Sequence, residues 1–162
     1  MELARVVTVS DRCAAGTRDD VSGPLLAEAL TAAGYRAEVV VVPDGEESVR
    51  LALLDALDAG ARLVVTTGGT GVGPRDRTPE GTRGVLDRPL PGIAELLRAR
   101  GADKSAHAAL TRGIAGVVDA VEGAGGALVV NLPGSPRAAA EGIAVLLPLV
   151  PHVLDQLTGG DH

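Results

Sequence analysis

Three Val-rich apolar runs alternate along the chain with helical patterns, and this alternation is the strongest constraint on the fold. The runs cover 4–9, 38–42 and 61–67, and each is bounded by Gly, Pro or Asp. Between them, apolar residues recur at helical spacing within 25–30 and 49–57. The alternation predicts buried parallel strands joined by right-handed helical crossovers.

The second half of the sequence extends this pattern. A third helix is expected from Pro91 to just before Gly101. Residues 113–121 and 126–132 are predicted to form two strands, most simply as a hairpin on the flank of the sheet. The last helices are expected over 136–147 and 149–157. The predicted fold class is α/β: a single three-layer α/β/α domain with a mostly parallel sheet.

The length and composition of the chain are those of one compact domain. Its 162 residues, 46% of them apolar, suffice for one core over 1–162, with a frayed tail at about 158–162. The single Cys13 cannot form an internal disulfide, which favours a reducing, cytoplasmic setting. No signal peptide is recognisable, and no apolar stretch is expected to reach the roughly 18 residues of a membrane span. We therefore expect no membrane association.

The charge of the chain argues against a nucleic-acid partner. The net charge is -6, and Tyr35 is the only aromatic residue. Nucleic-acid binding depends on clustered Lys and Arg, and single-strand binding also depends on aromatic stacking. A small anionic ligand would instead need backbone amides or a metal ion to offset the negative charge.

Polar or glycine-rich sequence follows each of four predicted strands. These segments read "SDR", "PDGEE", "GGTGVGPRD" and "NLPGSP". Open α/β sheets bind ligands beyond the carboxyl ends of their strands, so the four segments are expected to converge on one cleft.

The glycine loop of the third exit matches neither named nucleotide motif. No Lys-Ser or Lys-Thr pair closes it, and Pro74 stands where the third glycine of G-x-G-x-x-G would be. Its residues Gly68, Gly69, Thr70 and Gly71 can still bring backbone amides close to an anion. A plain turn that needs positive φ is the alternative.

Three polar residues near these exits each have a local alternative. Thr78 can cap a helix that begins at Pro79, whereas Asp76 is either a turn acid or a carboxylate that holds a divalent cation beside bound phosphate. Asp44 with Glu47 matches a capping box. Alternatively, Asp44 and Asp76 share one Mg²⁺; spacing does not decide between these interpretations.

The last exit combines a cap with a glycine turn. Ser135 is predicted to cap a helix whose first residue is Pro136, which would point free amides at the same sheet edge. A plain strand-turn-helix connection explains the same residues. Asp11, after the first strand, is likewise either a site residue or part of a solvated turn.

Taken together, these segments resemble the molybdenum cofactor biosynthesis family that contains MogA, MoaB and the gephyrin G domain. The resemblance rests on "TVSDR", "DDVSGPLL", "VPDGEE", "TTGGTGVGPRDRTPE", "PGIAELLR", "ALTRGIAG" and "NLPGSP", in order from about Ala4 to Leu157. It implies a molybdopterin-binding fold, a homotrimer, and Mg²⁺-dependent transfer of AMP from ATP to molybdopterin. A partner protein would insert molybdenum afterwards.

The resemblance also implies roles for individual residues. It places catalysis at Asp44 and Asp76, the same two acids that could share Mg²⁺ as a metal site. Pterin and nucleotide contacts map onto Ser10, Asp11, Gly68, Gly69, Thr70, Gly71, Thr78, Thr111, Asn131, Pro133, Gly134 and Ser135. A non-catalytic molybdopterin-binding homologue of the MoaB type and a generic α/β nucleotide phosphohydrolase are the alternatives.

Overall fold

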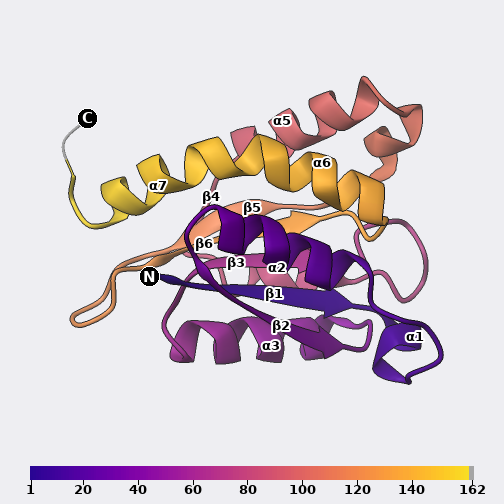
Figure 1. Cartoon of the computed structure of the whole chain (residues 1–162), viewed down its shortest axis with the longest axis horizontal. Helices are drawn as coiled ribbons and strands as arrows, with labels where there is room; N and C mark the ends of the chain where they lie inside the picture. Colours follow the sequence, from indigo (N-terminus) through magenta and orange to yellow (C-terminus); the bar gives the residue numbers. More distant parts are fainter. Residues whose placement is uncertain (161–162) are drawn as a thin grey trace.

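A six-stranded mixed sheet lies between two layers of helices (Figure 1). The computed structural model describes residues 1–160. The strands run in the order β2-β1-β3-β6-β5-β4, and the first four are parallel to one another. Their bounds are β1 Leu3–Val9, β2 Arg36–Val42, β3 Ala61–Thr67, β4 Arg88–Pro89, β5 Ala115–Val118 and β6 Ala127–Leu132. The predicted fold class is confirmed.

The helices divide between the two faces of the sheet. Helices α2, α5, α6 and α7 pack over one face, whereas α3 packs on the other with α4 beside it (Figure 1). The bounds are α1 Asp11–Ala14, α2 Ser22–Ala32, α3 Glu46–Asp58, α4 Thr78–Arg83, α5 Pro91–Ala102, α6 Pro136–Leu146 and α7 Val150–Leu157, with 3-10 turns η1 Ala106–Leu110 and η2 Leu147–Leu149.

The central strands are buried on both faces, which explains their continuous apolar sequences. Every residue of β1 is buried. Ala4 and Val6 contribute to the core under α2, α6 and α7, whereas Val7 and Val9 contribute to the core under α3. This alternation follows from the period of two in a strand. Strand β2 is an edge strand and is only partly buried.

The predicted hairpin forms, but it is integrated into the sheet. Strands β5 and β6 are antiparallel, as expected, and β6 also pairs in parallel with β3. The edge on this side is therefore β4, which pairs with β5 over Arg88 and Pro89. A two-residue strand leaves no periodic signal in a sequence, which is why it was not predicted.

The last two predicted helices form one nearly continuous segment. The turn η2 joins α6 to α7, so that the helical stretch Pro136–Leu157 has 22 residues and is long and apolar enough, by length and composition, to cross a membrane. The expectation that no apolar stretch reaches that length is wrong, because the 3-10 turn accommodates Pro148 at its second position and the helical stretch continues past it. One face of the segment is buried in the sheet core through Ala139, Ile143, Leu146, Val150 and Leu154. It is the core helix of a globular domain.

The described part of the predicted tail has the hydrogen bonds of a helix cap. The amides of Gly159 and Gly160 donate to the carbonyls of Gln156 and Asp155. Gly159 has φ +84, so the arrangement is a Schellman cap. Residues 161–162 of the predicted tail lie outside the described residues.

Candidate active site

The carboxyl ends of the parallel strands meet in one place, as expected. Gly68, after β3, has φ +102, and a Cβ there would overlap the carbonyl oxygen of Val9 at the end of β1. A Cβ on Gly134, after β6, would lie 3.2 Å from the Cα of Gly68. The amide of Ser10 donates to Val42 at the end of β2 (2.9 Å). Only glycine permits this close approach at Gly68.

The glycine loop presents a run of unpaired backbone amides. Within residues 1–160, no hydrogen bond uses the amide of any residue from 69 to 72. Gly69 has φ +66, and Thr70 is only 5% exposed. Thr70 is buried, where amides almost always have a partner, whereas Val72 is exposed. The run is therefore suited to receive water or an anionic ligand.

Asp44 does not form the predicted capping box. Helix α3 begins at Glu46 with Gly45 as its N-cap and without a side-chain cap, while Glu47 pairs with Arg50. The Asp44 carboxylate instead accepts from the amide of Asp11 (2.9 Å), and the Asp11 carboxylate accepts from the amide of Asp44 (3.1 Å). A long-range acceptor role has replaced the local cap, so Asp44 ties the exit of β2 to that of β1.

Arg75 completes this acidic cluster. Its guanidinium donates to both carboxylate oxygens of Asp11 (3.1 and 2.9 Å) and to the carbonyl of Asp44 (2.9 Å). Hydrogen bonding from Arg75 lowers the pKa of Asp11. Burial raises the pKa of Asp44, and the negative charges of Asp11 and Asp76 raise it further. Asp44 and Asp76 therefore lie on the same side of the molecule, within electrostatic reach of each other.

Asp76 closes the glycine loop as a turn acid. One of its oxygens, Oδ2, accepts from the amide of Gly73 (2.9 Å), and its own amide donates to the Gly73 carbonyl (3.1 Å). Within residues 1–160, no hydrogen bond uses Asp76 Oδ1 or Asp44 Oδ1. Each acid thus has one oxygen fixed by a backbone amide and one available.

Thr78 is not the predicted helix cap. The N-cap of α4 is Arg77, and the buried hydroxyl of Thr78 donates to the carbonyl of Gly68 (2.9 Å). The Thr78 amide also donates to the Gly69 carbonyl (3.1 Å). Thr78 therefore anchors the start of the glycine loop to α4.

The "NLPGSP" turn is held at both sides. Ser135 accepts from the amide of Ala138 (3.2 Å) with Pro136 in the first helical turn, so the predicted cap is confirmed. The carbonyl of Pro133 accepts from the Thr67 hydroxyl (2.7 Å). The carbonyl of Gly134 accepts from Ser22 on α2 (2.8 Å).

The side chain of Asn131 is fully committed within the scaffold. It donates to the hydroxyls of Thr66 and Thr82, both at 3.0 Å, and accepts from the amide of Ile114 (3.1 Å). It is 4% exposed. The geometry therefore gives Asn131 a structural role beneath the site.

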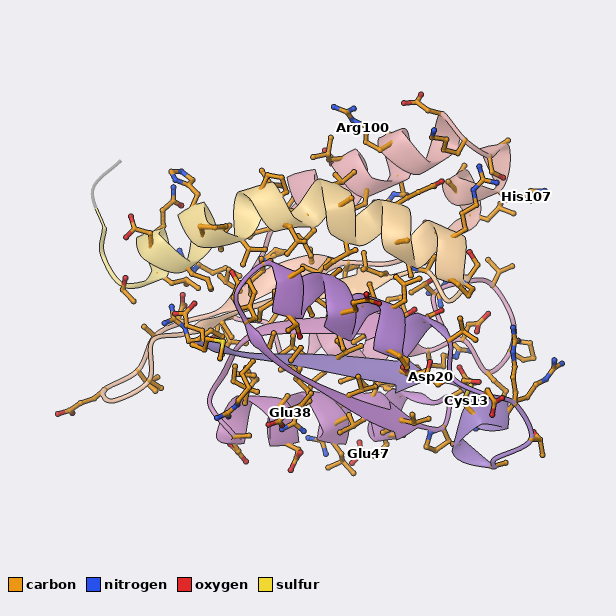
Figure 2. The ribbon with its side chains drawn as sticks, viewed as in Figure 1. Cys13, Asp20, Glu38, Glu47, Arg100 and His107 are labelled. Atoms are coloured by element: carbon orange, nitrogen blue, oxygen red, sulfur yellow. The ribbon has the colours of Figure 1, made fainter. Side chains whose placement is uncertain are left out.

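Two cavities flank these segments. The smaller, of about 310 Å³, lies at the carboxyl ends of β1, β3 and β6 and is lined by Ser10, Cys13, Asp20, Gly68, Gly134 and Ser135, among others. Figure 2 shows Cys13 and Asp20 at this end of the molecule. Asp44 and Asp76 lie outside the lining of either cavity.

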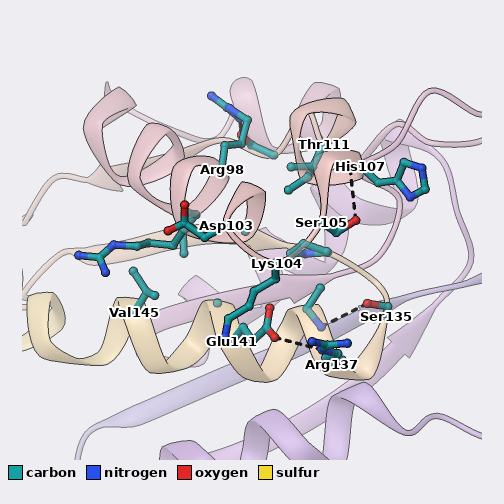
Figure 3. Close-up of a pocket in the computed structure, with 18 of the residues that line it drawn as sticks. Arg98, Asp103, Lys104, Ser105, His107, Thr111, Ser135, Arg137, Glu141 and Val145 are labelled. Carbon is teal, nitrogen blue, oxygen red and sulfur yellow. Dashed lines mark hydrogen bonds and ion pairs between the residues drawn. The ribbon is translucent and has the colours of Figure 1, made fainter.

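The larger cavity, of about 660 Å³, lies between α5, η1 and α6 (Figure 3). Its lining includes Thr111, Asn131 and Pro133, and it shares Ser135 with the smaller cavity. Lys104 extends across it toward α6, where Glu141 pairs with Arg137 (3.2 Å). The predicted substrate residues are thus divided between two cavities with a common wall.

Two arginines of the site were missed by sequence reasoning. Arg75 holds the Asp11 and Asp44 cluster, and Arg112 hydrogen-bonds to the glycine loop. Each is adjacent in sequence to a predicted residue, Asp76 or Thr111. Their position beside those residues was the only available signal, because their contacts are with distant backbone.

The described residues contain no preformed group of three or more His, Cys, Asp or Glu that could hold a metal ion. Two carboxylates with one available oxygen each suit a cation that takes its other ligands from water or phosphate. Mg²⁺ binds in this way in many nucleotide sites.

Comparison with known proteins places the chain in a family. Residues 5–152 match the family described as "Probable molybdopterin binding domain". The chain belongs to this MogA/MoaB family. Members of this molybdopterin-binding family function in molybdenum cofactor biosynthesis, and the resemblance noted from the sequence is confirmed.

Individual relatives support the same assignment. The chain is 39% identical to the molybdopterin adenylyltransferase of Pyrococcus furiosus over 92% of this chain and 87% of that one. It is 42% identical to a molybdenum cofactor biosynthesis bifunctional protein of Synechococcus elongatus over 99% of its own residues, but it spans only about half (49%) of that relative. The molybdopterin biosynthesis Mog protein of Mycobacterium ulcerans superimposes with a TM-score of 0.88 at 42% identity, over 97% and 99% of the two chains.

Proposed function

We propose that this MogA/MoaB family member transfers AMP from ATP to the terminal phosphate of molybdopterin, giving adenylyl-molybdopterin and pyrophosphate. One observation carries the proposal: the unpaired amides of residues 69–72 adjoin two acids, Asp44 and Asp76, that each keep one oxygen available. Amides facing carboxylates are suited to a phosphate chain with its counter-ion. The relative from Pyrococcus furiosus, named an adenylyltransferase, supports the same reaction.

The reaction is a displacement at the α-phosphorus of ATP. A phosphate oxygen of molybdopterin forms a bond to that phosphorus, and the bond to the bridging oxygen of the departing pyrophosphate breaks. The enzyme has little covalent chemistry to perform, so positioning and charge stabilisation supply the rate. The amides of residues 69–72 hold phosphate oxygens and stabilise the added negative charge.

Asp44 and Asp76 would hold Mg²⁺ through their available oxygens. When bound, Mg²⁺ supplies positive charge that neutralises the phosphates. The fixed oxygen of each acid keeps the other in place, since the amides of Asp11 and Gly73 restrain the carboxylates. Arg75 adds positive charge beside Asp44 without occupying its available oxygen.

The two cavities suit the two halves of such a reaction. The smaller cavity is lined by Gly68 and the helix-capping Ser135, and we assign the phosphate of molybdopterin to it, while the amides of residues 69–72, outside its lining, would hold the phosphates of ATP. The larger cavity has a mostly apolar lining that also includes polar and charged side chains, and we assign the pterin to it through Thr111, Pro133 and Ser135. Asn131 would contribute indirectly, because its hydrogen bonds fix the strands and the helix beneath the two cavities.

The setting of the reaction is proposed from the sequence. The lone Cys13 and the globular core packing of α6 and α7 favour the cytoplasm. The resemblance favours a homotrimer and a molybdenum-insertion partner. Leu146 is buried in the protomer core, and Leu147, Leu149 and Val153 pack partly against it, so sedimentation at several protein concentrations is the test of the trimer.

Incubation of the protein with ATP, Mg²⁺ and molybdopterin tests the reaction. Adenylyl-molybdopterin and pyrophosphate are expected in equal amounts. Release of phosphate without a pterin product would indicate a nucleotide phosphohydrolase instead. Tight pterin binding without any product would indicate a non-catalytic homologue of the MoaB type, since solved relatives include both MogA and MoaB proteins.

A further inference from the structure

Arg112 hydrogen-bonds to the glycine loop and its flanking residues through both its side chain and its backbone amide. Its Nε donates to the carbonyl of Gly71 (2.8 Å), and one terminal nitrogen donates to the carbonyl of Asp76 (2.9 Å). The other terminal nitrogen donates to both carboxylate oxygens of Glu80 (2.6 and 3.2 Å). The backbone amide of Arg112 also donates to the carbonyl of Thr70 (2.7 Å). One residue thus fixes the loop at three carbonyls.

These contacts determine where the loop amides point. The carbonyl and the amide of a trans peptide point in opposite directions. The backbone amide of Arg112 holds the Thr70 carbonyl, which turns the Gly71 amide away from it. The guanidinium holds the Gly71 carbonyl, which turns the Val72 amide away in the same manner. Both amides belong to the unpaired run at residues 69–72. Arg112 therefore holds these amides in the orientation that leaves them available to an anion.

Arg112 also lies beside the larger cavity. Its two chain neighbours, Thr111 and Gly113, line that cavity, and the carbonyl of Gly113 accepts from Arg98 on α5 (2.9 Å). A molecule seated in the larger cavity would contact the residues on either side of Arg112. The same short segment therefore contacts both the cavity and the glycine loop.

We infer that Arg112 is a positioning residue that holds the glycine loop ready for phosphate and links that geometry to occupancy of the larger cavity. The inference rests on the proposed function for its substrates. Because the contacts are to backbone carbonyls, it predicts an effect on anion binding that can be measured without turnover. A residue that only supported the fold would change thermal stability and leave the two ligands independent.

Three variants separate the loop contacts from the ion pair. Arg112→Lys keeps the charge but loses the planar fork that reaches two carbonyls and Glu80 together. Glu80→Gln weakens the ion pair and leaves the carbonyl contacts in place. Arg88→Lys is the matched control, because Arg88 makes a comparable pair with Asp119 on the exposed hairpin side. Thermal unfolding is recorded for each, and Arg112→Gln replaces Arg112→Lys if the latter does not fold.

The first measurement uses inorganic pyrophosphate as the probe, with calorimetric titration and amide hydrogen exchange of residues 68–77. Arg112→Lys is expected to bind pyrophosphate about ten- to hundredfold more weakly and to exchange faster in this segment. Glu80→Gln is expected to change binding by less than about threefold, and Arg88→Lys not at all. Unchanged binding and exchange in Arg112→Lys would overturn the inference, as would an equally large loss in Glu80→Gln.

The second measurement tests the link between the cavities. In the parent, bound molybdopterin is expected to tighten the affinity for a non-hydrolysable ATP analogue about fivefold or more, and Arg112→Lys should remove this gain. Equal gains in both proteins would contradict the link. If the parent makes no adenylyl-molybdopterin while Arg112→Lys still loses pyrophosphate binding, the proposed function fails and the positioning role stands. If Arg112→Lys shows normal turnover and unchanged pyrophosphate binding, the proposed function stands and the positioning role fails.

Discussion

Asp11 and Asp44 exchange hydrogen bonds across two strand exits, each carboxylate accepting from the backbone amide of the other (2.9 and 3.1 Å). Arg75 pairs with the side chain of Asp11 but only with the carbonyl of Asp44. The two acids are therefore neighbours in the structure, but their pKa values are shifted in opposite directions. Asp11 has its counter-charge, whereas Asp44 is partly buried beside two other acids without one of its own. This asymmetry suits Asp44 to a cation brought by the substrate.

Replacement of Asp44 by Asn should stabilise the folded protein at neutral pH. The pKa of folded Asp44 lies above its ordinary value of 3.8, mainly because of burial. Protonated Asp44 therefore costs the folded protein no stability below about pH 3.8. As the pH rises through the raised folded pKa, ionisation of the buried carboxyl lowers the free energy of unfolding. Asp44→Asn should gain up to about 1 kcal/mol over the parent at pH 7, after solvent screening, and nothing at pH 3. Denaturant unfolding at both values checks this; a loss at pH 7 would contradict it.

Asp11→Asn should show the opposite sign at the same site. Hydrogen bonding from Arg75 holds the pKa of Asp11 below its ordinary value of 3.8. The stabilising effect of this carboxylate is therefore present above about pH 3.8 and lost on acidification. Unfolding midpoints of Asp11→Asn should fall below those of the parent at neutral pH and meet them in acid. Equal midpoints at all pH values would show that the Arg75 pair contributes no stability.

Asp76→Asn should separate binding from turnover. The amide side chain can still accept from Gly73, so the loop is expected to keep its shape. Loss of the negative charge should reduce kcat for adenylyl transfer at least about hundredfold, with pterin affinity unchanged. The matched control is Asp58→Asn, an exposed acid near the end of α3. A variant that still makes adenylyl-molybdopterin at the parental rate would remove Asp76 from the mechanism.

Gly68→Ala should unfold the protein far more readily than Gly34→Ala. Both glycines have positive φ, but a Cβ on Gly34 meets nothing within 4 Å, whereas one on Gly68 overlaps the Val9 carbonyl. Gly34→Ala should therefore cost only the backbone strain, about 1–2 kcal/mol. Gly68→Ala should cost at least about 3 kcal/mol, since the strand ends must also move apart. Similar losses would mean that the strand exits are not in close contact.

Asn131→Ala should lower the free energy of unfolding more than Ser135→Ala, because Asn131 is a buried structural residue and Ser135 is an exposed helix cap. Removing the Asn131 side chain takes away the partner of the Thr66 hydroxyl and of the Ile114 amide, while Thr82 keeps its hydrogen bond to Thr78, so about 3 kcal/mol should be lost. Removing the Ser135 hydroxyl loses one cap contact, at about 1 kcal/mol. Chemical denaturation of both variants provides the comparison. A larger loss for Ser135→Ala would contradict the structural role given to Asn131.

Much of the fold could be predicted because it depends on local or periodic features. The strands 4–9 and 61–67 were recognisable from continuous apolar runs, and the Ser135 cap from its position before Pro136. Convergence of the strand exits followed from parallel topology alone. The edge strand β4 was not predictable, since two residues carry no period.

The roles of the site acids were decided only by tertiary structure. Local rules offered Asp44 and Thr78 as helix caps, yet both side chains hydrogen-bond elsewhere, to Asp11 and to the carbonyl of Gly68. A short polar side chain bonds whichever backbone group the packing brings nearest, and sequence shows only the neighbouring ones. The same reason hid the contacts of Arg75 with Asp11 and Asp44, and those of Arg112 with the glycine loop, since all of these partners are distant in sequence. Strand pattern and glycine positions were thus encoded locally, whereas the arrangement of charge around residues 69–72 exists only once the strand ends have met.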